Sequence, residues 1–176
     1  MLLVASAVLW AVIAFVTLPH IRQLAGGAAP FDLRWSGYSY EDARAFLAAI
    51  GEPGRAYYLN PELILDCIFP PLYSVFFALA FWWLTMPGRL RQGAVPLPLR
   101  WALVALSFII AILDGIENFS IAGMIWTWPN LSAGLVHVGS LATQSKLVAA
   151  TMSELLLVLF AGTAALRRIR SWRGQP

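Results

Sequence analysis

Long apolar stretches alternate with short polar segments along this chain, and each long stretch is sufficient to cross a bilayer. A membrane-spanning helix needs about 20 predominantly apolar residues. The pattern places helices at about 1–20, 55–86, 98–128 and 132–169, with an external segment at 21–54. The sequence therefore predicts an all-α integral membrane bundle of four transmembrane helices, forming a single domain over residues 1–176.

The external segment is expected to contain a short helix of its own. Ser39 and Asp42 are spaced as a capping pair, and the apolar positions that follow recur at helical spacing. These positions are Ala43, Phe46, Leu47 and Ile50. Gly51 should end this helix, and residues 52–54 should form a turn. We expect the helix to lie on the bundle or the membrane interface, and the charged residues of the segment, including Asp32, to face water.

Two of the long helices carry features that predict irregularity. Pro61 is expected to start or kink the second helix, and Pro70-Pro71 to bend it, because proline removes a backbone donor. The fourth stretch would extend about 55 Å as a helix, which exceeds the thickness of a bilayer core. Its spanning part is expected at 147–166, so residues 132–146 should lie outside the membrane or at its interface.

Composition agrees with a membrane protein, and the placement of charge predicts its orientation. Hydrophobic residues make up 60% of the chain, charged residues make up 12%, and the mean hydropathy is +0.72. The net charge is +3, but seven arginines lie in the 88–100 loop and the C-terminal tail, which contain no acid. The positive-inside rule makes both segments, and hence both termini, cytoplasmic, as in a bacterial inner membrane. The predicted partner is therefore the lipid bilayer and not nucleic acid.

The third helix carries polar residues on one face. Asp114, Glu117 and Asn118 fall within one third of the helix circumference, and Ser107 and Ala111 continue that face. A carboxylate inside hydrocarbon costs a few kcal/mol or more unless it is paired, protonated or bound to a metal. Two acids on one face therefore require partners from other helices.

Ionisable residues of the other helices lie at a similar depth. Measured along the helices, Asp66, Asp114, Glu117 and Glu154 all fall in the outer half of the bundle, and His20, His137 and Lys146 lie on the same side. This coincidence predicts one shared site. The structural alternative is that the acids only fix the helix register, and that Glu154 pairs with Lys146.

The residue types limit the chemistry of such a site. The sequence has no GxSxG, HExxH, CxxC or phosphate-binding glycine loop. Carboxylates suit Mg²⁺, Ca²⁺ or Mn²⁺, so a divalent cation is a candidate cofactor, and a carboxylate pair can instead hold a proton. Asp66, Asp114 and Glu117 are the candidate acid/base groups or metal ligands, with His20 and His137 less favoured as ligands. The candidate ligand-binding residues are Asn118 as an orienting amide, Arg55 as a clamp for anionic groups, Tyr58 and Glu154.

Three stretches resemble a pattern found in small bacterial four-helix membrane proteins of no known activity. They are GYSYEDARAFLAAIGEPGRAYY, LDCIFPPLY and DGIENF, which follow the order GYS, LG..GR..Y, D..FP..Y and D..EN over about residues 31–120. The resemblance implies that the motif residues form one unit and carries no function with it. These residues are Gly37, Tyr38, Ser39, Gly51, Arg55, Tyr58, Asp66, Pro70, Tyr73, Asp114, Glu117 and Asn118.

The leading hypothesis is a membrane protein whose outward-facing carboxylate site binds a cation, a small polar ligand or a lipid headgroup. In one version the protein is an enzyme acting on a lipid-like substrate. The alternatives are proton- or cation-coupled transport and an accessory subunit whose polar groups are only structural. The sequence leaves open the choice between enzyme and non-enzyme, the ligand and the oligomeric state.

Overall fold

The computed structural model describes residues 1–87 and 95–173, and every regular element in these ranges is a helix. Four helical segments are long and apolar enough to cross a membrane, by length and composition. They are Leu3–Leu24, Gly51–Leu84, Leu97–Trp126 and Ala133–Arg170. The predicted all-α bundle of four long apolar helices is therefore confirmed.

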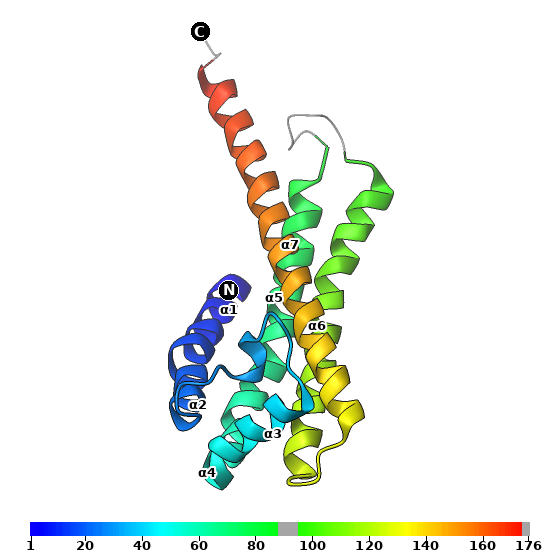
Figure 1. Cartoon of the computed structure of the whole chain (residues 1–176). Helices are drawn as coiled ribbons and strands as arrows, with labels where there is room; N and C mark the ends of the chain where they lie inside the picture. Colours follow the sequence, from blue (N-terminus) through cyan, green and yellow to red (C-terminus); the bar gives the residue numbers. More distant parts are fainter. Residues whose placement is uncertain (88–94, 174–176) are drawn as a thin grey trace.

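The three helices α5 (Leu63–Leu84), α6 (Leu97–Trp126) and α7 (Ala133–Arg173) pack together as the centre of the bundle (Figure 1). Near the N-terminus, α1 (Leu2–Val12) lies beside α5, and α2 (Leu18–Leu24) packs against α4 (Gly51–Tyr57). The C-terminus and the start of α6 lie at one end, which we call the Arg-rich end. The arginines whose side chains are described there are Arg100, Arg167, Arg168 and Arg170.

The opposite end, which we call the α3 end, carries the segment between α2 and α4 (Figure 1). Helix α3 (Tyr40–Ala49) begins at the predicted capping box: the Ser39 amide donates to Asp42 Oδ2 at 2.9 Å and the Asp42 amide donates to Ser39 Oγ at 3.1 Å. The four apolar positions predicted from spacing are buried, with at most 3% exposure. They join Phe31 and Tyr58 in the core at this end of the bundle.

The prediction of a turn at residues 52–54 is wrong. Gly51 has a φ of +64° and ends α3 as expected, but α4 (Gly51–Tyr57) begins at once. Pro53 lies in the first turn of α4, where a helix has no acceptor for the backbone N–H groups, so proline is tolerated there. Pro61, expected to start or kink the second helix, falls in a π-helical turn, Tyr58–Glu62. Pro70 and Pro71, expected to bend it, lie inside α5, which is helical on both sides of them.

Helix α7 runs without a break over the predicted fourth stretch, including the residues expected to lie outside the membrane or at its interface. Its first turns pack against α6, and Val136, Thr143 and Lys146 are buried there. Lys146 is therefore enclosed between helices, while the depth of residues 132–146 relative to the membrane stays a prediction. The helix is longer than a membrane is thick, and the packing of its first half against α6 decides which part is buried.

Candidate functional site

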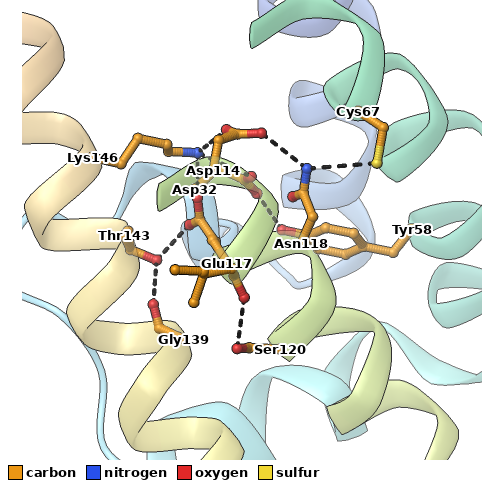
Figure 2. A network of polar contacts seen from close by, with 11 residues as sticks. Asp32, Tyr58, Cys67, Asp114, Glu117, Asn118, Ser120, Gly139, Thr143 and Lys146 are labelled. Atoms are coloured by element: carbon orange, nitrogen blue, oxygen red, sulfur yellow. Dashed lines mark hydrogen bonds and ion pairs between the residues drawn. The ribbon is translucent and has the colours of Figure 1, made fainter. Parts of the chain in front are cut away.

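Lys146 lies at the centre of a buried ion cluster formed by three separate parts of the chain. Its Nζ atom lies 2.9 Å from Oδ1 of Asp114, forms an ion pair with Glu117, and lies 4.0 Å from Oδ1 of Asp32 (Figure 2). The four side chains are 11% exposed or less. We call Asp32, Asp114, Glu117 and Lys146 the ion cluster.

Helix geometry sets the positions of the residues on α6 and α7. Asp114 and Glu117 are three residues apart and therefore share a face of α6, and the Asn118 amide donates to Asp114 Oδ2 at 3.1 Å. On α7, Thr143 and Lys146 have the same spacing and face α6. The Thr143 hydroxyl contacts the Glu117 carboxylate, so each helix supplies partners that the other requires.

Asp32 reaches the cluster from the segment between α2 and α3, which folds back over the bundle. It lies in a single 3-10 turn, Phe31–Leu33, and is 8% exposed. The Tyr58 hydroxyl donates to Asp32, and the Tyr38 amide donates to Ser140 Oγ on α7 at 2.8 Å. The expectation that Asp32 faces water is therefore wrong, because Phe31, next to it in the chain, and Tyr38, later in the same segment, are buried in the core and carry it inward.

Tyr38 covers the cluster from the same segment. Its hydroxyl is buried without a hydrogen-bond partner in the described part of the chain, and a Cβ atom added to Gly139 would lie 2.6 Å from it. Burial and the neighbouring Glu117 carboxylate raise the pKa of the Tyr38 phenol well above its ordinary value, so the group stays a neutral hydroxyl. Gly139 permits this close approach because it has no side chain.

Two more acids are buried near the ion cluster. Glu62 is 0% exposed and Asp66 is 7% exposed. Among the described residues, neither carboxyl oxygen of Glu62 has a hydrogen-bond partner, and Oδ2 of Asp66 has none. In the described residues, five acids are therefore buried and Lys146 is the one buried basic side chain. Net negative charge in apolar surroundings is costly, so such a group of acids favours bound protons or a cationic ligand.

An open groove of about 510 Å³ lies between α5 and α6 on the far side of Asn118. Its walls are apolar and include Ile64, Ile68, Phe119 and Trp126, all well exposed on the surface of the bundle. Polar groups come from Asn118 and Cys67, whose amide nitrogen and sulfur lie 3.9 Å apart (Figure 2). Because Asn118 also bonds Asp114, one side chain connects the groove to the ion cluster.

The structure brings together only part of the predicted site. Asp114, Glu117 and Asn118 lie in or beside the ion cluster, with Asp66 close to Asn118, and Tyr58 joins through Asp32. The other four lie elsewhere. Arg55 donates to the Leu47 carbonyl at 2.7 Å and lies over the Trp128 ring, Glu154 and His137 are exposed, and the His20 ring packs on Tyr57 at 4.5 Å.

The geometry does not favour the divalent cation that the sequence suggested. In the described part of the chain, no group of three His, Cys, Asp or Glu side chains is arranged to hold a metal ion. The position between Asp114 and Glu117, where a bridging cation would bind, is taken by the Lys146 ammonium. The chain thus supplies this positive charge itself.

Sequence reasoning missed the central role of Lys146 and the participation of Asp32, Glu62 and Thr143. One signal was available. Lys146 is the only lysine of the chain, whose other basic residues of the Lys/Arg type are all arginine, and it lies within a long apolar stretch. The pairing of Lys146 with Glu154, which spacing alone suggested, is wrong, because Lys146 instead contacts acids on α6.

The fold and the site define an all-helical bundle of the membrane type with a buried lysine–carboxylate cluster. No protein-family model, curated protein or solved structure matches the chain.

Proposed function

We propose that this chain is an integral membrane protein that binds a lipid-like amphiphile in the groove between α5 and α6. The apolar part of the ligand would lie along the groove, and its polar group would meet Asn118. The buried acids, chiefly Asp114 and Glu117, would bind that polar group or exchange protons with it. By the positive-inside rule, the Arg-rich end faces the cytoplasm of a bacterial inner membrane, and the groove opens to the outer leaflet.

The observation that carries this proposal is the position of Asn118. Asn118 is 4% exposed, lies among the apolar residues that line the groove, and donates a hydrogen bond to Asp114 of the ion cluster. A mostly apolar cavity of several hundred Å³ with a few convergent polar groups is the usual form of a small-molecule site. The Asn118 Oδ1 atom is buried without a hydrogen-bond partner among the described residues, so a ligand donor that reached it would satisfy it.

Blocking the groove tests the proposal. Gly115 lines the groove, and a Cβ atom added there meets nothing within 4 Å, so the variant Gly115→Phe should fill the groove without disturbing the helix. Gly162 on α7 is equally open and lies outside the groove, so Gly162→Phe is the matched control. A photoactivatable phospholipid in nanodiscs should label the peptides around Cys67 and Phe119 in the native protein and in Gly162→Phe, and not in Gly115→Phe. Equal labelling of the two variants would contradict binding in this groove.

A second candidate, proton-coupled transport, is favoured by the excess of buried acids over Lys146. Such acids can exchange protons without changing the helix packing. Vesicles containing the protein and a trapped pH indicator should then equilibrate an imposed pH gradient faster than empty vesicles. The variant Asp114→Asn should abolish the difference. If vesicles with native protein equilibrate no faster than empty vesicles, the transport candidate is wrong and the amphiphile proposal is the one that remains. A stoichiometric metal found by elemental analysis of the purified protein would instead support the hypothesis that the site binds a divalent cation.

A further inference from the structure

Three buried serines lie on the central helices between the ion cluster and the Arg-rich end. They are Ser74 on α5, Ser107 on α6 and Ser153 on α7, and each is 0% exposed. Neither the ion cluster nor the groove includes them.

Two contacts show that these serines lie at one level of the bundle. The ion pair of Lys146 with Asp114 sets the register of α7 against α6, and Ser153 and Ser107 each lie seven residues farther toward the Arg-rich end. The Phe81 and Phe160 rings, with centroids 6.2 Å apart, set the register of α5 against α7. Ser74 and Ser153 each lie seven residues before those rings. The serine level is therefore about 10 Å from the ion pair, at 1.5 Å per residue.

The hydroxyl groups at this level have few partners among the described residues. In this part of the chain, the Oγ atoms of Ser74 and Ser153 are buried without a hydrogen-bond partner, while Ser107 Oγ donates to the Leu103 carbonyl at 3.2 Å and keeps its acceptor sites. A buried hydroxyl without a partner is costly, more so in apolar surroundings.

The prolines of α5 add acceptors between the ion cluster and the serines. Pro70 and Pro71 have no N–H, so the carbonyls of Asp66 and Cys67 lack the donors that a regular helix provides four residues on. Helix carbonyls point along the axis toward the C-terminal end, which here is the direction of Ser74.

We propose that Ser74, Ser107 and Ser153 hold internal water between the ion cluster and the Phe81–Phe160 contact. A buried water molecule typically makes two to four hydrogen bonds to polar groups that would otherwise be unsatisfied. The serine hydroxyls and the free carbonyls supply that number of neutral donors and acceptors. The site carries no charge of its own, which suits water better than an ion. It rests on the packing of α5, α6 and α7 and does not depend on the proposed amphiphile.

Radiolytic footprinting in ¹⁸O-labelled water tests this site, because X-ray pulses convert bound water to hydroxyl radicals that oxidise the nearest side chains. Ile110 and Ile121 are both 0% exposed and lie on the same helix, but Ile110 lies between the ion cluster and the serine level, whereas Ile121 lies in the core at the α3 end. In nanodiscs, Ile110 should take up ¹⁸O several-fold faster than Ile121. Equal rates in the native protein would overturn the proposal.

Matched variants then assign the water to the serines. The double variant Ser74→Ala/Ser153→Ala removes two hydroxyls with little change in volume, and should lower the Ile110 rate to that of Ile121. Ser120→Ala is the control, because Ser120 is also buried but its hydroxyl already donates to the Ile116 carbonyl at 2.8 Å. It should leave the ratio unchanged. Fast labelling of Ile110 that persists in a folded double variant would show that the water is held elsewhere, and would also overturn the proposal.

Discussion

The Nζ atom of Lys146 lies 2.9 Å from Oδ1 of Asp114, and this ion pair joins α7 to α6 inside the bundle. The two residues are 32 positions apart in sequence. Lys146 also pairs with Glu117, so one ammonium compensates two carboxylates of the same helix face. The first prediction concerns this shared charge.

Replacing Lys146 by Met should destabilise the protein by about 3–5 kcal/mol, because it leaves buried carboxylates without their cation. The double variant Lys146→Met/Glu117→Gln should recover a large part of this loss, since it removes a negative charge together with the positive one. Thermal unfolding in detergent, followed by circular dichroism, measures both. If the single variant unfolds at the same temperature as the native protein, the ion pair does not stabilise the bundle.

Asp114→Asn should separate a binding role from a structural one. The amide keeps the size of the side chain and can still bond Asn118, but loses the charge that faces Lys146. We expect the folded variant to lose labelling by the photoactivatable phospholipid. Glu154→Gln should leave the labelling unchanged and the free energy of unfolding within about 0.5 kcal/mol of the native value, because Glu154 is exposed. Full labelling of the Asp114 variant would assign Asp114 to the scaffold.

Glu62→Gln should be tolerated, although Glu62 is fully buried. Its neighbour Thr17 donates its hydroxyl proton to the Ile13 carbonyl at 3.2 Å and can therefore only accept from Glu62. Asp32, another neighbour, is an acid as well. The Gln amide supplies the donor that these surroundings require, so the unfolding temperature should stay equal or rise. A large drop would show that Glu62 works as a carboxylate.

The capping box of α3 predicts a pH dependence of the stability of this helix. The hydrogen bond from the Ser39 backbone N–H to Asp42 holds the pKa of that carboxyl below its ordinary value of 3.8. Because the folded pKa is the lower one, the stabilisation is complete above pH about 4 and is lost as the pH falls through the folded value. Hydrogen exchange of the α3 amides should therefore accelerate, relative to a free peptide, on acidification. Asp42→Asn should remove this dependence; an unchanged profile would assign it to another group.

Orientation can be checked by labelling single cysteines in a Cys67→Ser background. Cysteines replacing Arg44 and Arg170 should react with a membrane-impermeant maleimide from opposite sides, since α3 and the C-terminal end lie at opposite ends of the bundle (Figure 1). The positive-inside rule puts Arg170 and Arg91 in the cytoplasm. Arg91 lies outside the residues that the structure describes, and labelling is its direct test. Reaction of positions 44 and 170 from one side would contradict the topology.

The sequence by itself determined the features that depend on local spacing. The apolar stretches predicted four long helices, and the Ser39–Asp42 pair predicted the start of α3. The 3.6-residue period placed Asp114, Glu117 and Asn118 on one face of α6, where they are buried as a group. Each of these follows from neighbours within about one or two helical turns, so each can be worked out without knowing the fold.

Only the tertiary structure decided which partners meet these groups. Spacing along the fourth helix suggested that Lys146 pairs with Glu154, but the rotation of α7 about its axis turns Lys146 toward α6 and leaves Glu154 exposed. Asp32 appeared to belong to a water-facing segment, and the burial of Phe31 beside it draws it inward. The rotation of one helix against another and the course of a covering loop depend on packing between distant residues. Hydrophobic periodicity within a single helix does not contain that information.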